Sequence, residues 1–198
     1  MDFGWSQAQV ALRQEVRQFL AKRLTPDVAE ELAHGGNHTA NDPVAIDRRG
    51  RGSHVTRLYQ EIEDRGWLGM SWPKEYGGQG KDRLSQYIVE EEFARAGIGV
   101  GGAGSGAPAV MAVGTEEQKR EFIPKLLKGE YTFALGFTEP SGGADLASLQ
   151  CRAVEDGDYF VVNGQKIFTS AAHAATHMYL MCRTDPDAPK HRGISILI

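Results

Sequence analysis

The stretch Phe137–Asp145, which reads Phe-Thr-Glu-Pro-Ser-Gly-Gly-Ala-Asp, is the part of the sequence that decides the fold. It joins two segments that are expected to be strands. Gly142 and Gly143 let the backbone approach a ligand closely, and successive N–H groups in such a turn form a concavity that binds anions. The Thr138 hydroxyl can both donate and accept a hydrogen bond. By itself, however, a glycine-containing β connection is more often structural than a phosphate site.

A second segment, Lys166–Ser170, has the chemistry of a flavin contact. It places the ring of Phe168 beside the hydroxyls of Thr169 and Ser170 at the expected end of a strand. A flavin ring needs an apolar or aromatic face, and its N5 and carbonyl edge need hydrogen-bond partners. Standing alone, this segment would be interpreted as a core phenylalanine with surface hydroxyls.

Residues 1–130 are predicted to form an N-terminal all-α helical domain. Ser6 with Gln9, and Thr115 with Gln118, have the pattern of capping boxes, which start helices. Apolar residues recur at helical spacing along this part of the chain. The residues predicted to face the helical core are Leu12, Val16, Phe19, Leu20, Val55, Leu58, Tyr59, Ile62, Leu84, Ile88 and Phe93.

Breaks in the helical pattern mark the expected connections. Residues 25–54 contain prolines, glycines and the arginines at 48, 49 and 51, and they are predicted to form an irregular, mobile surface connection. Gly66 and Gly129 are expected to end helices, and Pro124 is expected to kink or divide its helix. The run Glu90–Glu92 is predicted to be a solvated face, because neighbouring residues on a helix diverge and cannot converge on one ion.

Residues 131–198 are predicted to form an antiparallel β domain. Asn163-Gly164, between two apolar runs, is the signal of a type I′ hairpin joining residues 159–162 to 165–169. Further strands are expected at 131–137, 178–182 and 194–198. The predicted fold class is therefore α+β and multidomain, an all-α helical bundle followed by an antiparallel β domain.

Composition excludes several classes of function. The net charge of -4 and the pI of about 5.9 argue against an electrostatic nucleic-acid binder. No apolar run approaches the roughly 20 residues that span a bilayer, and the first residues lack the pattern of a secretory signal. A cytoplasmic protein without membrane association is therefore expected. Cys151 and Cys182 are expected to be buried thiols, with no disulfide and no metal site.

Four motifs, taken in order, resemble the acyl-CoA dehydrogenase family. Gly136–Ser148 resembles the family signature, and Asn163–Ser170 resembles its flavin-facing hairpin. Gly66–Gly80 resembles the segment between its N-terminal helices, and Gly114–Leu127 resembles its last helix before the β domain. The resemblance covers nearly the whole chain apart from residues 25–54, and it implies an acyl-CoA dehydrogenase-like fold.

The resemblance implies that the protein binds FAD and dehydrogenates an acyl-CoA thioester between its α and β carbons. In that family, Phe137 and Thr138 would lie against the flavin ring. Gly143 and Ala144 would approach the FAD pyrophosphate by their backbones.

The same resemblance assigns the second segment and the substrate side. Phe168 would flank the flavin, with Thr169 and Ser170 near its N5 edge. Ser141 would lie towards the coenzyme A part of the substrate.

Three departures from the family pattern bear on activity. Ala144 stands where serine or threonine is usual, so a hydroxyl contact worth about 1 kcal/mol is missing. Phe168 stands where tryptophan is common, which leaves a smaller aromatic surface for contact with the flavin. The family's C-terminal helical domain and its catalytic glutamate are expected to lie beyond this chain. We predict no residue of this chain as the base that removes the α-proton. Glu139 has a structural role in the family signature, and His173 and His177 are expected to be ordinary surface or core residues.

The chain ends on the apolar run Ile194–Ile198, which would leave an unsupported strand edge. We therefore expect a fragment, or a domain completed by another chain. Family members form homo- or hetero-oligomers, and the expected electron acceptor is an electron-transfer flavoprotein. Residues 72–78 and the long 25–54 connection are reminiscent of bacterial members that act on bulky acyl groups such as steroid side chains.

Three functions remain open from the sequence. The first is the N-terminal portion of an FAD-dependent acyl-CoA dehydrogenase. The second is a non-catalytic partner subunit or cofactor-free remnant that serves assembly. The third is a flavin monooxygenase or nitroalkane oxidase of the same superfamily.

Overall fold

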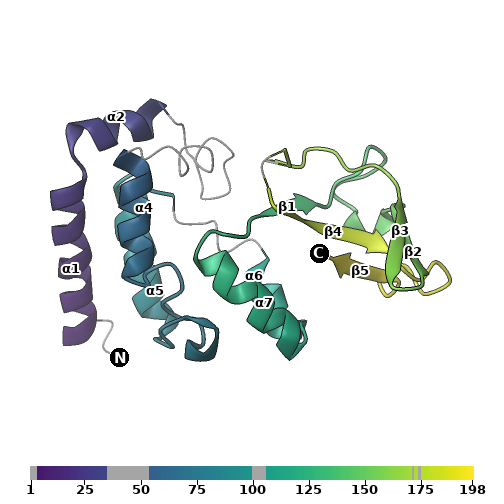
Figure 1. Cartoon of the computed structure of the whole chain (residues 1–198), viewed down its shortest axis with the longest axis horizontal. Helices are drawn as coiled ribbons and strands as arrows, with labels where there is room; N and C mark the ends of the chain where they lie inside the picture. The colour runs from purple at the N-terminus through teal and green to yellow at the C-terminus, as the bar shows by residue number, and fades with distance from the viewer. Residues whose placement is uncertain (1–3, 35–53, 100–105, 171, 174) are drawn as a thin grey trace. The chain divides into compact units, whose positions relative to one another are not determined.

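A computed structural model describes residues 4–34, 54–99, 106–170, 172–173 and 175–198 (Figure 1). The chain divides into two units, Met1–Thr132 and Phe133–Ile198. The first unit is helical and the second is built on a sheet.

The helical unit contains six α-helices and a short 3₁₀ helix among its described residues. Ser6 and Thr115 form the expected capping boxes at the starts of α1 and α7. The elements are α1 (Gln7–Arg23), α2 (Pro26–His34), α4 (His54–Asp64), η1 (Lys74–Tyr76), α5 (Arg83–Arg95), α6 (Ala107–Val113) and α7 (Glu116–Leu127).

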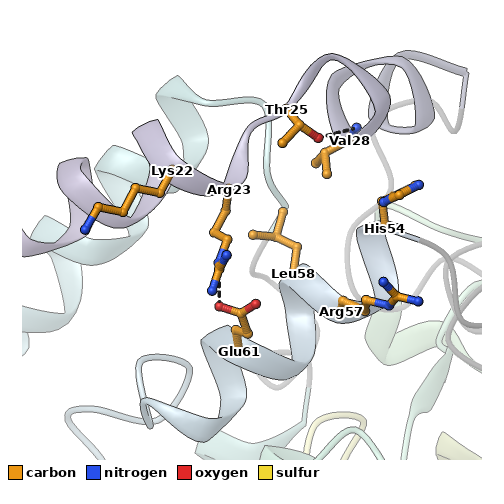
Figure 2. A pocket seen from close by; sticks show the side chains of 8 residues that line it. All are labelled: Lys22, Arg23, Thr25, Val28, His54, Arg57, Leu58 and Glu61. Atoms are coloured by element: carbon orange, nitrogen blue, oxygen red, sulfur yellow. Dashed lines mark hydrogen bonds and ion pairs between the residues drawn. The ribbon is translucent and has the colours of Figure 1, made fainter.

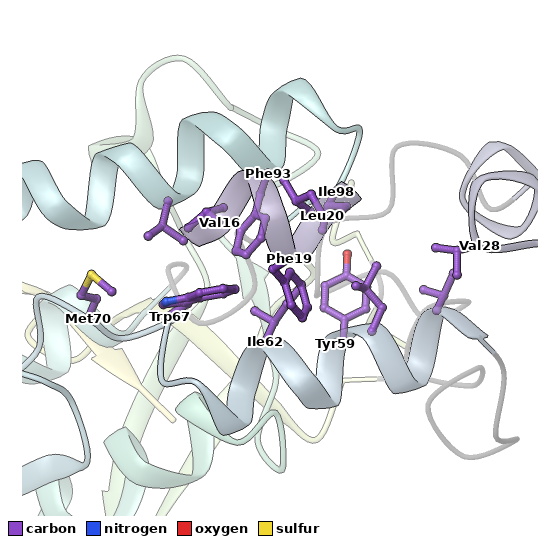
Figure 3. Close-up of a cluster of buried hydrophobic side chains, with 13 residues drawn as sticks. Val16, Phe19, Leu20, Val28, Tyr59, Ile62, Trp67, Met70, Phe93 and Ile98 are labelled. Carbon is purple, nitrogen blue, oxygen red and sulfur yellow. The ribbon is translucent and has the colours of Figure 1, made fainter. Parts of the chain in front are cut away.

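The core of this unit gathers around three aromatic rings (Figure 3). The Trp67 ring lies edge-on to Phe19, with centroids 5.1 Å apart, and is tilted against Phe93 at 5.7 Å. Phe93 and Ile88 are fully buried, as the helical period predicts, whereas Leu84 is 46% exposed and does not face the core. The other predicted core residues are buried or pack against this cluster.

The prediction that residues 25–54 are irregular is wrong for their first part, because Pro26–His34 form helix α2. The Thr25 hydroxyl accepts from the Val28 amide at 3.4 Å, which caps the helix, and proline is favoured in a first helical turn. Val28 is buried and Leu32 packs on the same cluster, so two apolar anchors four residues apart hold α2 in place. Residues 35–53, with the three arginines, lie outside the described residues.

Two smaller expectations are wrong in part. Helix α7 continues across Pro124 as a single element, so this proline does not divide the helix, and the predicted kink stays a prediction. Glu92 is 5% exposed rather than solvated. The Arg17 guanidinium donates to its carboxylate at 2.8 and 2.9 Å, and this ion pair ties α1 to α5.

Among its described residues, the sheet unit has five strands in a mixed arrangement. The prediction of a purely antiparallel domain is wrong in this respect, because β1 and β4 pair in parallel from Phe133 opposite His177 to Gly136 opposite Leu180. The long chain between these strands is sufficient for the crossover that a parallel pair requires. The elements are β1 (Phe133–Gly136), η3 (Leu146–Ser148), β2 (Arg152–Asp156), β3 (Tyr159–Asn163), β4 (His177–Arg183) and β5 (Ile194–Leu197).

The hairpin lies one strand earlier than predicted. β2 and β3 pair antiparallel around a turn at Gly157, whose φ is 62°, and residues 164–169 form no strand. Gly164 has a different role from a turn residue, because a Cβ there would lie 2.7 Å from the Cα of Cys151. The glycine is therefore needed for close packing against Cys151, the residue before β2. Cys151 and Cys182 are buried and free, as predicted.

The burial of Phe93 gives a test of the helical core. We expect Phe93→Ala to lower the free energy of unfolding by about 3–5 kcal/mol, because it leaves a cavity between α5 and Trp67. Tyr87→Ala, on the exposed side of the same helix, should change it by about 0.5 kcal/mol or less. Urea unfolding followed by far-ultraviolet circular dichroism measures both, and equal losses would contradict this description of the core.

Candidate functional site

A buried ion pair joins the two segments that the sequence predicts to meet the flavin. The Lys166 ammonium lies 2.8 Å from the Glu139 carboxylate, and their side chains are 6% and 5% exposed. Lys166 also donates to the carbonyl of Phe137 at 3.1 Å. The next amide, Ile167 N–H, donates to the carbonyl of Thr138 at 2.9 Å. Residues 137–139 are thus held by residues 166–167, and we call this set of contacts the clasp.

Two backbone amides, those of Gln150 and Cys151, complete the clasp around the Glu139 carboxylate. Its two oxygens accept from the amides of Gln150 at 2.7 Å and Cys151 at 2.9 Å, in addition to Lys166. Burial raises the pKa of this carboxyl, but Lys166 and the two amides outweigh that effect and hold the pKa below its ordinary value of 4.5. A carboxylate so stabilised is a poor proton acceptor, so the geometry favours a structural role for Glu139 over that of a base.

The signature forms a tight turn after Glu139. The backbones of Glu139 and Gly142 exchange two hydrogen bonds of 3.1 Å, and Ser141 lies exposed at the tip. A Cβ at Gly142 would be 2.9 Å from the Ser148 hydroxyl, and one at Gly143 would be 3.3 Å from the Thr138 methyl. The glycines therefore let the turn close over Thr138.

The end of the signature is tied to the loop between β4 and β5. The Asp145 carboxylate pairs with the Lys190 ammonium, which lowers the pKa of Asp145. Arg183 donates to the carbonyl of Ala147 at 2.9 Å and so supports η3. These contacts leave Gly143 and Ala144 exposed between two anchored ends.

In the second segment, Lys166–Ser170, the backbone of Phe168 and the hydroxyl of Thr169 are both in unfavourable environments. Phe168 has a φ of 56°, which a non-glycine residue rarely adopts, and the residue is 87% exposed. The Thr169 hydroxyl is buried and has no hydrogen-bond partner among the described residues. An exposed aromatic face beside a polar atom that lacks a partner fits a flat, hydrogen-bonding cofactor such as FAD. Ser170 is exposed.

Phe137 is half-buried, and its ring packs on Tyr179 with centroids 5.9 Å apart. Its predicted contact with the flavin stays a prediction. The clasp residues Lys166, Gln150 and Cys151 were missed as site-building residues. Lys166 lies in a recognised motif, but nothing in the sequence marks the amides of Gln150 and Cys151 as partners of Glu139.

The helical unit has a separate hollow that contains none of the predicted site residues (Figure 2). This cavity of about 160 Å³ lies among α1, α2 and α4. The Arg23 guanidinium donates to Glu61 at 2.7 Å across it. Within the described ranges, no group of three or more His, Cys, Asp or Glu side chains is arranged to hold a metal ion. No helix in the same ranges is long and apolar enough to cross a membrane.

Comparisons with known proteins agree with this geometry. The sequence profile of the acyl-CoA dehydrogenase N-terminal domain matches residues 6–130, and that of the middle domain matches residues 134–198. This chain belongs to the acyl-CoA dehydrogenase family. The matches confirm the resemblance and the two-part fold class, a helical domain followed by a sheet domain.

Individual family members show how much of a whole protein the chain represents. It is 43% identical over 192 residues to acyl-CoA dehydrogenase FadE29 of Mycobacterium tuberculosis, covering 96% of this chain and 46% of that protein. The Tcur3481-Tcur3483 steroid ACAD structure superposes with a TM-score of 0.78 at 43% identity, covering 100% of this chain and 48% of that one. The ChsE4-ChsE5 complex from Mycobacterium tuberculosis superposes with a TM-score of 0.79 at 40% identity and the same coverage. The chain thus spans about half the length of these relatives.

The clasp predicts acid sensitivity in the sheet unit. The pKa of Glu139 is lowered in the folded chain, so the ionised carboxylate stabilises the folded state. This contribution is complete above about pH 4.5 and is lost as the pH falls through the lowered pKa. We expect the amide signals of Gln150 and Cys151 to report this transition in an NMR titration from pH 7 to 3.

Two variants test the assignment to Glu139. Glu139→Gln leaves Lys166 buried without its counter-charge and should cost about 3–5 kcal/mol of stability. Glu155→Gln, at an exposed position of β2, should keep both the stability and the acid transition of the parent chain. An acid transition that persists unchanged in Glu139→Gln would contradict the assignment.

Proposed function

We propose that the protein containing this chain is an FAD-dependent acyl-CoA dehydrogenase, and that this chain supplies the part of its site that faces the flavin. The observation that carries the proposal is the pairing of the exposed Phe168 ring with the buried Thr169 hydroxyl, which lacks a partner, beside the clasp. Family membership supports the same cofactor. When bound, FAD would supply the hydride acceptor for oxidation of the acyl chain.

The chain's own residues would hold and orient the cofactor. Phe137 and Thr138 would meet the flavin ring from the signature side and Phe168 from the other segment, with Tyr179 packed against the Phe137 ring. Thr169 and Ser170 would offer hydroxyls to the polar edge of the ring. The exposed backbones of Gly143 and Ala144 would approach the pyrophosphate, where amide groups suit an anion.

The substrate side of the proposal is an acyl-CoA thioester. Ser141, exposed at the tip of the turn, would lie towards its coenzyme A part. The structural relative described as a steroid ACAD supports a bulky acyl group. We also propose a cytoplasmic oligomer that passes electrons to an electron-transfer flavoprotein.

A second candidate function is that of a partner subunit without its own catalytic role. The relatives described as the ChsE4-ChsE5 complex and as Tcur3481-Tcur3483 each carry two component names, which favours a hetero-oligomer. Ala144 favours this candidate as well, because methyl replaces a hydroxyl that family members usually place near the cofactor. FAD binding by the chain separates the two candidates.

We expect the purified chain to bind FAD and quench its fluorescence. Phe168→Ala should weaken binding about fivefold, because an aromatic contact contributes about 1 kcal/mol. Phe160→Ala, an exposed ring on β3 of the same unit, should leave the dissociation constant unchanged. A colourless chain that takes up no added FAD would contradict the proposal and favour the partner-subunit role.

The reaction itself is tested in the complete protein. Anaerobic addition of straight-chain and steroid acyl-CoA thioesters should bleach the bound flavin if the protein is a dehydrogenase. A flavin that stays oxidised with every thioester, but is reduced by a nitroalkane, would instead support the oxidase function.

A further inference from the structure

We infer that Lys166 is a positioning residue that holds the two flavin-facing segments in register and keeps Phe168 in its presenting conformation. The inference rests on the proposed function for the identity of the ligand. It adds a residue that does not itself face the cofactor, since the Lys166 side chain is buried within the clasp.

The first step concerns the signature side. The ammonium group of Lys166 donates to both the Phe137 carbonyl and the Glu139 carboxylate, at 3.1 and 2.8 Å. These two acceptors flank Thr138, whose own carbonyl accepts from Ile167 N–H at 2.9 Å. Three consecutive residues of the signature are therefore tied to two consecutive residues of the other segment. Thr138 cannot shift along the 166–167 segment unless these bonds break.

The second step concerns Phe168, which follows the clasp directly. A left-handed φ at a residue with a bulky side chain is unfavourable and persists only where its surroundings impose it. On its N-terminal side, Lys166 and Ile167 are fixed to the signature. The backbone must turn sharply at Phe168, which leaves the ring exposed and directs the next side chain, Thr169, inward, where its hydroxyl is buried. Loss of the clasp would let Phe168 relax to an ordinary φ.

The third step concerns why lysine suits this position. An ammonium group has three donors on a flexible stem, and it can reach a carbonyl and a carboxylate that lie in different directions. A guanidinium keeps the charge but is larger and planar, so it should satisfy Glu139 better than the Phe137 carbonyl. Methionine keeps much of the length of the lysine side chain but removes its hydrogen bonds to the Phe137 carbonyl and the Glu139 carboxylate.

The experiment compares four variants of the full chain. Lys166→Met removes the ammonium, and Lys166→Arg keeps its charge. The double variant Glu139→Gln with Lys166→Met removes the pair together, so that no buried charge is left alone and the fold is retained. Lys128→Met is the matched control, because it removes an exposed ion pair, that of Lys128 with Glu130, from the helical unit, which contains none of the proposed site residues.

Two readouts separate positioning from simple stability. In the double variant, we expect the Ile167 amide to exchange with solvent about tenfold faster or more, since bonds to a charged group are lost. The Met181 amide, within the pairing of β4 with β5, should keep its rate. The FAD dissociation constant should rise about tenfold, with a smaller rise in Lys166→Arg and none in Lys128→Met.

The outcomes are distinguishable. A folded double variant that keeps the parent Ile167 exchange rate overturns the inference, and so does faster exchange with unchanged FAD affinity, which would make Lys166 a stability element only. If the parent chain takes up no FAD, the proposed function fails. The Ile167 exchange rate then still decides whether Lys166 holds the two segments together.

Discussion

The buried pair of Glu139 and Lys166 is the interaction on which the candidate site depends. Two charges with side chains about 5% exposed are costly to take out of water, and they are tolerated here because the carboxylate accepts three hydrogen bonds and the ammonium donates two. The pair also lies where two segments distant in sequence must meet. Its geometry sets the positions of Thr138 on one side and Phe168 on the other.

Much of the fold follows from local rules that the sequence displays. Capping boxes at Ser6 and Thr115 and glycines at 66 and 129 mark helix ends by hydrogen bonds formed within a few residues. Buried residues such as Val16, Ile62 and Phe93 repeat with the helical period, because one face of each helix meets the same core. Such features are local, so a single sequence is sufficient to predict them.

The failures come from interactions between distant residues. Glu92 has the sequence context of a solvated run, yet Arg17 on another helix makes its burial favourable. Asn163-Gly164 has the pattern of a turn, but the packing of Gly164 on Cys151 gives that glycine another purpose. The parallel pairing of β1 with β4 depends on a crossover that no local pattern encodes. The same limit hid the amides of Gln150 and Cys151, whose part in the site depends on the fold around Glu139.

The strain at Phe168 and the buried Thr169 hydroxyl connect this architecture with the proposed cofactor. Both are local costs that a folded chain rarely carries without a compensating contact. The most direct measurement is an FAD titration of the isotopically labelled chain followed by amide NMR. The account predicts that the largest shifts fall on residues 138, 142–144 and 168–170, with saturation as FAD binds. Shifts that are absent there, or largest in the helical unit, would contradict the assignment of this clasped site to a flavin.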